Sequence, residues 1–393
     1  MGWASGRSGA EPLHLVDVCA FYTPHGGGVK TYAEQKLRIG PELGARITVL
    51  APGDDHGVVD FGPGAQLVTI PAPRLPVDKN YWYFADQPVL HAALDALAPD
   101  LVECSSPWRS PAWVANWRGD VPRSLFMHAD PLTAYAYRWC DPLLPRSATD
   151  RLFAPYWHHI RSLSARYDSV ICASRDLAGR MEAGGVANIR CVAMGVDEGV
   201  FSPANRDPAL RAQLLADLDL PESAGLLIGV GRLAGEKRWP MVIEAVRRAS
   251  KERPLGLILL GGGRKEAEVR AVIGGDSHIK LLGPVRDRRR FAAILASSDA
   301  LVHGCEAETF GLAAAEARAS GVPVVVPDRG GAAEQADGGG GVTYRSADPE
   351  ALAQAILALA ALGFPRSQTG NGQTMRGHFE QLFAHYRERI AAH

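Results

Sequence analysis

The sequence has few cysteines, and none of them are paired by spacing. Its 393 residues include six cysteines, and no two stand as CxxC. Most lie in apolar runs such as VICAS, so the simplest interpretation is a set of buried, reduced thiols. Free thiols of this kind are typical of a reducing compartment.

A basic surplus, a signal peptide and a membrane span are also missing. The net charge of −1 argues against a broad nucleic-acid surface. The N-terminus MGWASGRSGAEP has no apolar core of a secretory signal. The run ALAQAILALAALGF, residues 351–364, is shorter than the roughly 18 residues of a span and predicts a packed helix. We expect a cytoplasmic protein, which leaves open docking on the inner face of the cell membrane.

Residues 21–36, FYTPHGGGVKTYAEQK, resemble a phosphate-binding loop but do not have its register. In a P-loop the lysine directly follows the last glycine, so that amides, ammonium and hydroxyl converge on one phosphate chain. Here Val29 separates Gly28 from Lys30, which turns the lysine away from the loop mouth. A P-loop ATPase is therefore excluded, and a glycine-rich turn between a strand and a helix remains.

The length suits two domains, because a single core rarely grows to this size. Short apolar runs predict strands over 13–21, 46–52, 100–106, 123–130 and 169–174, and again over 225–233, 255–263, 278–285, 299–304 and 322–328. Helical stretches alternate with these runs, which indicates parallel α/β sheets. We place an N-terminal domain over 1–200, a C-terminal domain over 201–377, and an amphipathic terminal helix over 378–393.

Two cations follow the first predicted strand of the second domain. In open α/β sheets, ligands bind at the carboxyl ends of the strands. Arg232 and Lys237, in GVGRLAGEKRWP, lie at such an end and suit a diphosphate. Taken alone, the pair is a weak signal, and a solvated surface is the favoured interpretation.

Two glutamates stand eight residues apart in the stretch 305–334. Glu308 follows a predicted strand, and Glu316 lies inside the helix that begins near Gly311 and Leu312. The early amides of that helix can bind a phosphate. Glu316 can accept hydrogen bonds from ribose hydroxyls, and Glu308 can bind a sugar hydroxyl.

At this point the sequence resembles the retaining GT-B glycosyltransferases of family 4. Glu308 and Glu316 match the E-x7-E motif of that family, and four further stretches fall in its order and spacing: GGGVKTY, MGVDEGVFSP, GRLAGEK and ASGVPVVVPDRGGAAE. The resemblance covers nearly the whole chain. It implies two Rossmann-like, doubly wound parallel-sheet domains that face each other across a cleft.

The resemblance also implies roles for individual residues. His128, in FMHAD, would contact the donor sugar and act in catalysis with Glu308, Arg232 and Lys237. The predicted donor-binding residues are Gly27, Gly28, Gly231, Gly262, Val285, Thr309, Phe310, Gly311, Leu312 and Glu316. The amino-terminal glycine loop would then lie across the cleft from the nucleotide, with Lys30 and Thr31 as ordinary early-helix residues.

The expected reaction moves a hexosyl unit from a UDP- or GDP-sugar to a saccharide or lipid-linked acceptor. Negative charge builds on the leaving diphosphate, where Arg232, Lys237 and the helix start at Gly311 would stabilise it. No metal or other cofactor is then needed. The resemblance implies retention by front-side attack, with Glu308 binding the sugar and not attacking it.

The acceptor side is predicted from aromatic residues, because seven of the eight tryptophans precede residue 160. Trp82 and Trp108 stand beside Tyr, Arg and Lys, a mixture that suits sugar stacking or a membrane interface. An aromatic core explains them equally well. Asp130, beside His128, completes the predicted acceptor-binding set.

Other interpretations stay open. The same cleft could serve a nucleotide-sugar epimerase or a phosphorylase, although no lysine stands out for pyridoxal phosphate, or a non-catalytic nucleotide-sugar-binding module. The arginine-rich VRDRRRF, residues 285–291, is read as a solvated helix start in preference to a phosphate or lipid contact. The DLD at 217–219 resembles a metal motif of another glycosyltransferase fold and is attributed to chance.

Overall fold

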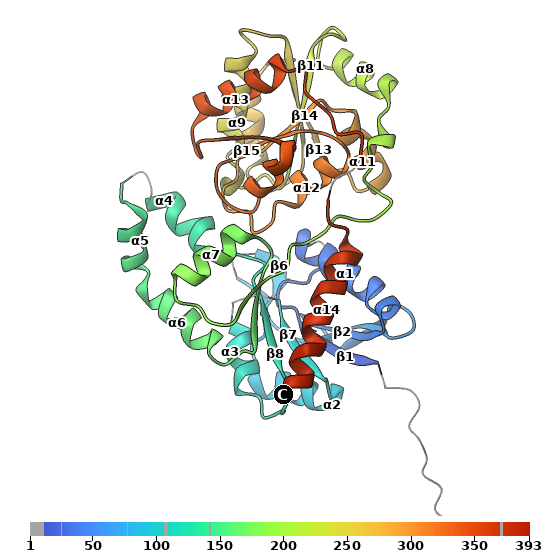
Figure 1. The fold of residues 1–393 in the computed structure, drawn as a ribbon, viewed down its shortest axis with the longest axis vertical. Helices are drawn as coiled ribbons and strands as arrows, with labels where there is room; N and C mark the ends of the chain where they lie inside the picture. The colour runs from blue at the N-terminus through green and yellow to red at the C-terminus, as the bar shows by residue number, and fades with distance from the viewer. Residues whose placement is uncertain (1–11, 25, 77, 106–108, 141–142, 370–371) are drawn as a thin grey trace, which may run out of the picture.

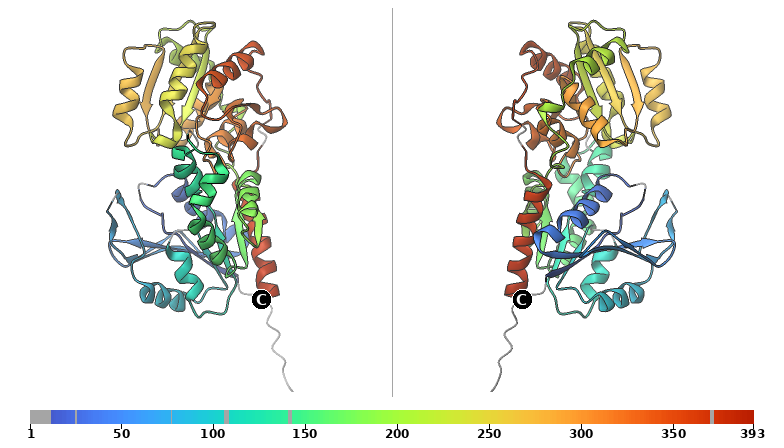
Figure 2. Two further views of the ribbon diagram at one scale, coloured as in Figure 1. Left: turned by 90° about the vertical axis from the view of Figure 1, so that its left-hand side faces the viewer. Right: turned by 90° about the vertical axis from the view of Figure 1, so that its right-hand side faces the viewer.

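The computed structural model of the chain describes residues 12–24, 26–76, 78–105, 109–140, 143–369 and 372–393. These residues form two α/β domains, one above the other in Figure 1 and in both side views of Figure 2. Each domain is built on a predominantly parallel sheet, which confirms the predicted fold class.

The first sheet has the order β10-β9-β8-β7-β1-β2-β4-β3, and only β3 pairs antiparallel to its neighbour. Its strands are β1 Leu13–Val18, β2 Ala45–Gly53, β3 Gly57–Asp60, β4 Ala65–Pro71, β7 Leu101–Cys104, β8 Arg123–Phe126, β9 Ser169–Cys172 and β10 Ile189–Cys191. A small hairpin, β5 Arg74–Leu75 and β6 Asp78–Trp82, stands beside it. The strands at the centre are buried on both faces, as expected where helices cover both sides of a sheet.

The helices of the first domain follow the predicted alternation. They are α1 Gly28–Ile39, α2 Gln87–Leu97, α3 Arg109–Asn116, α4 Arg138–Cys140, α5 Arg146–Leu152, α6 Ala154–Ser164 and α7 Arg175–Ala183, with a 3-10 turn η1 Pro41–Leu43 and a π-helical stretch η2 Leu132–Tyr137. Helix α1 ends at Ile39, and Pro41 opens a separate turn.

The second sheet has the order β13-β12-β11-β14-β15-β16, and all of its neighbours pair parallel. Its strands are β11 Gly225–Val230, β12 Leu255–Leu260, β13 Ile279–Gly283, β14 Ala300–Val302, β15 Val324–Pro327 and β16 Gly341–Tyr344. Its helices are α8 Pro208–Ala216, α9 Trp239–Ala249, α10 Glu266–Ile273, α11 Arg288–Ser297, α12 Leu312–Ala319 and α13 Pro349–Ala361, with 3-10 turns η3 Pro203–Asn205, η4 Gly235–Lys237 and η5 Ala333–Gly339.

Both sheets reverse their strand order beside the first strand of the domain. In the first sheet, β1 lies between β2 and β7, and in the second, β11 lies between β12 and β14. Loops that leave such a switch point on opposite sides open a crevice at the carboxyl ends of the strands. The fold thus predicts one ligand-binding edge in each domain.

The chain crosses between the domains twice, and the two crossings lie against each other. Val196 and Thr374 form a parallel bridge, in which the Val196 N–H donates to Gln373 O over 2.9 Å. A Cβ on Gly195 would lie 2.1 Å from the Thr374 carbonyl carbon, so the approach requires glycine. Two segments of the chain therefore connect the domains, one at Val196 and one at Thr374, and they are paired at this bridge.

The last helix, α14 Met375–Ala392, returns to the first domain (Figure 1). The predicted apolar face, Phe379, Leu382, Phe383 and Tyr386, is fully buried. Tyr386 donates a hydrogen bond to Glu103 Oε2 over 2.6 Å. The helix is thus a structural part of the first domain, although it follows the second in sequence.

The cysteines are free, and four of them, Cys19, Cys104, Cys172 and Cys305, are buried. Cys191 is exposed, which corrects the expectation for that thiol because β10 lies at the edge of its sheet. None of the helices in the described part of the chain is long and apolar enough to cross a bilayer.

Candidate functional site

The centre of the site is an ion pair at the carboxyl edge of the second sheet. Lys237 ends the turn η4 after β11, and its ammonium donates to Glu308 Oε1 in the loop after β14. The two side chains are 14% and 21% exposed, so the pair is largely buried yet reached by solvent. The structure therefore brings together two predicted residues that stand 71 positions apart in sequence.

His303 stands behind this pair and was missed by the sequence analysis. Its Nε2 lies 3.1 Å from Glu308 Oε1. Burial alone would raise the pKa of the Glu308 carboxyl, but the Lys237 ammonium and the His303 ring hold it well below its usual value. Glu308 is thus a carboxylate at neutral pH and accepts hydrogen bonds without donating any.

Three side chains near the pair could in principle hold a metal ion. Ligand atoms of His303, Cys305 and Glu308 lie within 4.8 Å of one another. However, the Lys237 ammonium is bonded to the same Glu308 oxygen. A divalent cation there would face a positive charge at close range, so the geometry fits an anionic ligand better than a metal.

Glycine shapes the loop that carries Lys237. Gly231 has φ +153°, and a Cβ there would lie 3.4 Å from Lys237 Cε. The lysine stem therefore lies against the Gly231 backbone. Gly262 lies beside the turn at Pro284–Val285, since its Cβ would be 3.6 Å from Pro284 Cδ. The predicted nucleotide-binding residues Gly231, Gly262 and Val285 thus gather on one edge of the sheet.

Arg232 does not join this pair. Its side chain is 69% exposed and forms an ion pair with Glu236 over 3.0 Å. A different arginine, Arg138 from the first domain, lies against the same loop, because a Cβ on Gly235 would be 2.2 Å from Arg138 Nη1. Arg138 from the first domain and Arg232 from the second therefore both lie at the loop that carries Lys237, and of these two arginines only Arg232 was predicted from the sequence.

The start of α12 is tied to the first domain. Gly311 has φ +85°, and a Cβ there would lie 2.7 Å from Ala332 Cα, so the turn into the helix requires glycine. Thr309 donates from Oγ1 to the His128 carbonyl over 3.2 Å. Phe310 is buried and Leu312 begins the helix. The free amides of α12 therefore lie where the two domains meet.

The second glutamate of the motif is buried against an arginine. Glu316, in α12, accepts a hydrogen bond from Arg288 Nη1 over 3.1 Å. Burial raises the pKa of the Glu316 carboxyl to about 7, against the opposing effect of Arg288. Arg288 belongs to the VRDRRRF stretch, so the interpretation of that stretch as a purely solvated helix start is wrong at this residue.

His128 lies among aromatic rings at the end of β8. Its ring stacks on Phe126 at 4.2 Å between centroids and meets Tyr32 edge-on at 4.7 Å. Burial, with a further effect of Lys36 and His378, holds its pKa well below the usual value, so the ring is neutral. Its Nε2 is buried and lacks a hydrogen-bond partner within the described residues.

The glycine loop of the first domain opens α1. Gly27 and Gly28 are exposed, and a Cβ on either would meet no atom within 4 Å. Lys30 donates from Nζ to the Pro24 carbonyl over 2.8 Å, which ties the lysine to its own loop. Lys30 and Thr31 therefore do not form a phosphate site, and the open backbone at 27–28 stays available.

The predicted acceptor residues separate in the structure. Asp130 caps η2: its Oδ1 accepts the Leu132 and Thr133 amides, and its Oδ2 pairs with Arg180 over 2.5 Å. Trp82 stacks under Arg74 and donates to Asp54 Oδ1 over 2.7 Å. Trp108 lies outside the described residues. These contacts use both carboxylate oxygens of Asp130 within the first domain. Its predicted role in acceptor binding stays a prediction.

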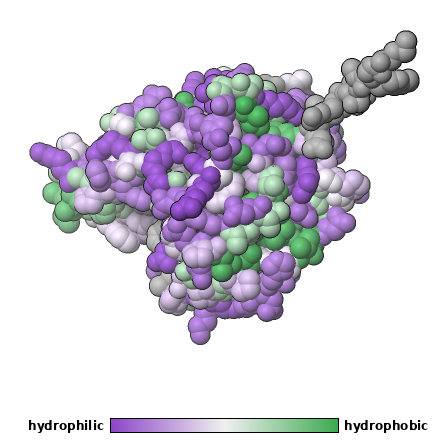
Figure 3. Space-filling view, turned by 90° about the horizontal axis from the view of Figure 1, so that it is seen from below, coloured by the Kyte–Doolittle hydropathy of each residue, from purple (hydrophilic) through white to green (hydrophobic). Residues whose placement is uncertain are grey.

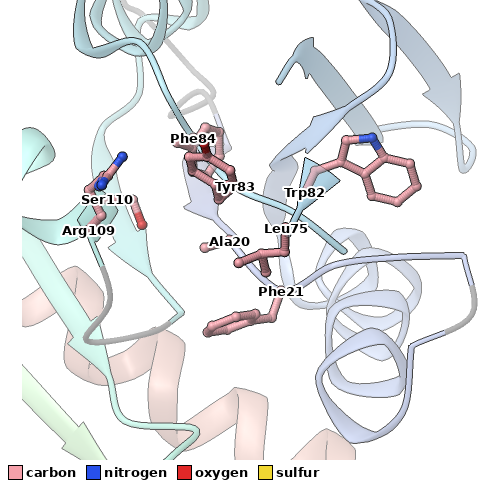
Figure 4. A pocket seen from close by; sticks show the side chains of 8 residues that line it. All are labelled: Ala20, Phe21, Leu75, Trp82, Tyr83, Phe84, Arg109 and Ser110. Atoms are coloured by element: carbon pink, nitrogen blue, oxygen red, sulfur yellow. The ribbon is translucent and has the colours of Figure 1, made fainter. Parts of the chain in front are cut away.

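Trp82 borders a small pocket beyond β1 (Figure 4). The lining residues are Ala20, Phe21, Leu75, Trp82, Tyr83, Phe84, Arg109 and Ser110. Its volume of about 10 Å³ has room for roughly one water molecule. The buried Ser110 hydroxyl lacks a hydrogen-bond partner within the described residues. An acceptor sugar would therefore need the pocket to open.

Comparison with known proteins supports the predicted family in both halves of the chain. The model "Glycosyl transferase 4-like domain" matches residues 27–196, and the model "Glycosyl transferases group 1" matches residues 224–361. The first match ends at Val196, in the interdomain connection, and the second begins at residue 224.

Among sequence relatives is a GDP-mannose-dependent alpha-(1-6)-phosphatidylinositol dimannoside mannosyltransferase of Mycobacterium tuberculosis, 28% identical over 356 residues that cover 89% of this chain and 88% of the relative. A D-inositol 3-phosphate glycosyltransferase of Xylanimonas cellulosilytica is 29% identical over 369 residues, 86% of this chain and 84% of the relative.

Solved structures share the fold. A sucrose-phosphate synthase from Thermosynechococcus elongatus superimposes with a TM-score of 0.74 at 19% identity and covers 97% of this chain and 100% of its own. The catalytic domain of starch synthase IV from Arabidopsis thaliana gives 0.69 at 15% identity, with 97% and 100% covered.

Proposed function

The chain belongs to the GT-B glycosyltransferases of family 4, and we propose that it moves a hexosyl unit from a GDP-linked sugar to a hydroxyl of a lipid-linked or saccharide acceptor. The observation that carries the proposal is the Lys237–Glu308 pair. It offers a fixed positive charge and a fixed carboxylate at the ligand-binding edge of the second sheet, next to the start of α12.

The donor is assigned from the relatives, since sequence motifs leave UDP and GDP open. Several relatives carry GDP-mannose in their names, including enzymes of Mycobacterium tuberculosis, Corynebacterium glutamicum and Mycolicibacterium smegmatis. GDP-mannose is therefore our first candidate. The base would lie along Gly262 and Val285, and the ribose at Glu316.

The diphosphate is the leaving group, and its growing charge needs stabilisation in the transition state. Lys237, Arg232 and the free amides of α12 at Gly311 and Leu312 would provide it. Arg232 is exposed here, so it would have to turn inward when the donor binds. With these groups in place the chemistry needs no metal, which we propose as the mode of action.

The sugar itself would lie between the two domains. The Glu308 carboxylate can accept hydrogen bonds from sugar hydroxyls, and the neutral His128 ring can bind the sugar from the opposite side. We propose retention of configuration by front-side attack, in which a phosphate oxygen takes the proton of the acceptor hydroxyl. Glu308 is then assigned to sugar binding, and no covalent nucleophile is needed.

A lipid-linked acceptor agrees with an apolar tip on the first domain. Exposed apolar side chains lie on η2, α4, α5 and the residues just before α5: Tyr135, Trp139, Leu143, Leu144 and Leu152. Trp139 and Leu152 are 64% exposed and Leu143 is 84% exposed. Seen from below in Figure 3, this region is the projection at the left, with hydrophobic atoms at its end.

The charges on this tip suit a membrane surface. Arg146 lies over the Tyr137 ring at 4.7 Å, and Arg151 is exposed on α5. The nearby Asp150 accepts a hydrogen bond from the Tyr137 hydroxyl and another from Trp157, so its charge points inward. Aromatic, aliphatic and cationic side chains together are typical of peripheral membrane contact. We propose that the protein works at the inner face of the membrane.

A donor screen tests the proposal. The purified protein is incubated with GDP- and UDP-hexoses, with and without phosphatidylinositol-type lipids, and released nucleoside diphosphate and glycosylated lipid are both measured. GDP release that depends on the lipid supports the proposal, and NMR of the product then reports the anomeric configuration. Nucleotide binding with neither release nor transfer would indicate a binding module, and conversion of the donor without an acceptor would indicate an epimerase.

An EDTA arm of the same screen tests the absence of a metal. Unchanged transfer after chelation is expected. Loss of transfer that Mg²⁺ or Mn²⁺ restores would overturn the metal-free mechanism.

A further inference from the structure

Arg288 is the first residue of α11 and differs from the arginines around it. Asp287 caps this helix by accepting the amides of Arg289 and Arg290, whose side chains point to solvent. The Arg288 side chain is instead 40% exposed and turns toward α12. Its guanidinium lies over the Phe201 ring at 4.8 Å and near the Phe291 ring at 5.9 Å. Two aromatic rings thus fix its direction.

The guanidinium bridges two carboxylates. Its Nη1 donates to Glu316 Oε1 over 3.1 Å, and its Nη2 lies 3.8 Å from Asp197 Oδ2. The Glu316 side chain is only 6% exposed, whereas the Asp197 side chain is 17% exposed. Arg288 is therefore the cation that a buried carboxylate needs in order to stay charged.

The bridge continues into the first domain. Asp197 lies in the connection between the domains, and its Oδ1 accepts a hydrogen bond from Arg38 Nη2 over 3.3 Å. Arg38 belongs to α1, the helix that begins at the glycine loop. A chain of alternating charges thus runs from Glu316 through Arg288 and Asp197 to α1.

We propose that Arg288 is a positioning residue of the donor site, which favours the ionised form of the Glu316 carboxyl, orients it for the ribose hydroxyls and anchors it to the interdomain connection. This inference rests on the proposed function, because it takes Glu316 as the residue that binds the ribose. Arg288 itself is not assigned a contact with the reacting atoms.

The electrostatics support a measurable consequence. Burial raises the pKa of Glu316 to about 7, Arg288 opposes that rise, and Asp197 adds to it. These are the charged groups that act on Glu316 from α11 and from the interdomain connection, and Arg38 stands behind Asp197 on α1. Without the guanidinium, the pKa of Glu316 must rise further, so the carboxyl would be protonated at neutral pH.

The test compares GDP binding by calorimetry between about pH 6 and pH 9, a range that brackets the Glu316 titration. Arg288→Ala should weaken GDP binding about fivefold at pH 7 if the pKa of Glu316 rises by about one unit. The loss should shrink as the pH rises and Glu316 ionises again. Arg288→Lys, which keeps the charge, should restore most of the affinity.

Two further variants complete the design. Arg289→Ala removes an exposed neighbour on the same helix and should leave the binding curve unchanged. Glu316→Gln should bind GDP more weakly than wild type at high pH, with little pH dependence across this range. Equal melting temperatures would show that each variant is folded.

The outcomes separate this inference from the proposed function. If wild type binds neither GDP nor UDP, the donor site itself is wrong. If wild type binds GDP and the curves of wild type and Arg288→Ala run parallel, Arg288 has only a structural or phosphate-binding role and the inference is overturned. The same holds if Arg288→Lys is as weak as Arg288→Ala.

Discussion

Each domain buries one lysine against carboxylates near the carboxyl ends of its strands, but the two clusters differ in how completely they are closed. In the first domain, Lys36 bonds Asp17 Oδ2 over 2.7 Å and Glu103 Oε1 over 2.5 Å, and all three side chains are fully buried. Ser105 and Tyr386 satisfy other oxygens of the two acids. In the second domain, Lys237 and Glu308 remain partly open to solvent.

The difference separates an ion cluster that holds the fold from one that can meet a ligand. The Lys36 cluster joins β1, β7, α1 and α14, and a ligand would have to break it to enter. The Lys237 pair instead lies at the carboxyl edge of the second sheet, partly open to solvent, with Glu308 a few residues before the start of α12. A buried lysine alone does not identify the site. The site is the pair that stays partly exposed and whose carboxylate oxygens are not all bonded within the described part of the chain.

The largest effect should come from opening the closed cluster. Lys36→Met would leave Asp17 and Glu103 buried side by side without a cation, which should lower the free energy of unfolding by about 3–5 kcal/mol. Urea unfolding followed by circular dichroism measures the loss. Lys30→Met, on the exposed side of the same helix, is the matched control. A loss below about 1 kcal/mol would show that the cluster is not what holds α14 in place.

Substitution in the Lys237–Glu308 pair should lower the transfer rate strongly and the free energy of unfolding much less. Lys237→Met should lower kcat about a hundredfold or more, since it removes a cation that faces the leaving diphosphate. Water can reach Glu308 through the open mouth, so the fold should tolerate the change better than Lys36→Met. Lys265→Met, a cation on the loop after β12, is the control. Transfer within threefold of wild type would remove Lys237 from the mechanism.

The features of the fold and of the site that depend on local sequence could be predicted. The strands of the two sheets show as apolar runs, and the buried face of α14 shows in Phe379 and Leu382 at helical spacing. Lys237 and Glu308 stand at strand ends, where an α/β fold places its ligands. These assignments need only periodicity and the position of a residue after a strand.

Contacts between distant segments could not be predicted. Arg288 stands in a run of arginines that gives no sign of which one turns inward, and its partner Glu316 is 28 residues away. His303 follows a buried strand like many structural histidines. Arg138 reaches the Gly235 loop from the other domain. In each case tertiary packing selects the partner, and composition or spacing carries no trace of it.

The smallest expected effect is the pH dependence of stability that His378 in the first domain produces. In His378 of α14, Nε2 lies 3.0 Å from the Tyr32 hydroxyl and Nδ1 lies 2.9 Å from the Ala193 carbonyl oxygen. Burial lowers the pKa of this ring to about 4. In the unfolded chain this ring takes a proton near pH 6.5. Its stabilising effect is therefore complete above pH 6.5 and is lost as the pH falls toward 4. At pH 5.5 the loss should be about 1.4 kcal/mol.

Urea unfolding at several pH values tests this effect against His378→Gln, which has no proton to gain. His128 has a lowered pKa of the same sign, but it is present in both proteins, so the difference between them isolates His378. His158→Gln, at an exposed position on α6, should follow wild type. Stability of wild type and His378→Gln that falls in parallel below pH 6.5 would mean that the docking of α14 does not depend on a neutral ring. If the free energy of unfolding falls less in His378→Gln than in wild type, α14 carries the acid sensitivity of the first domain. This effect is separate from the Glu316 titration, which should govern donor binding in the second domain.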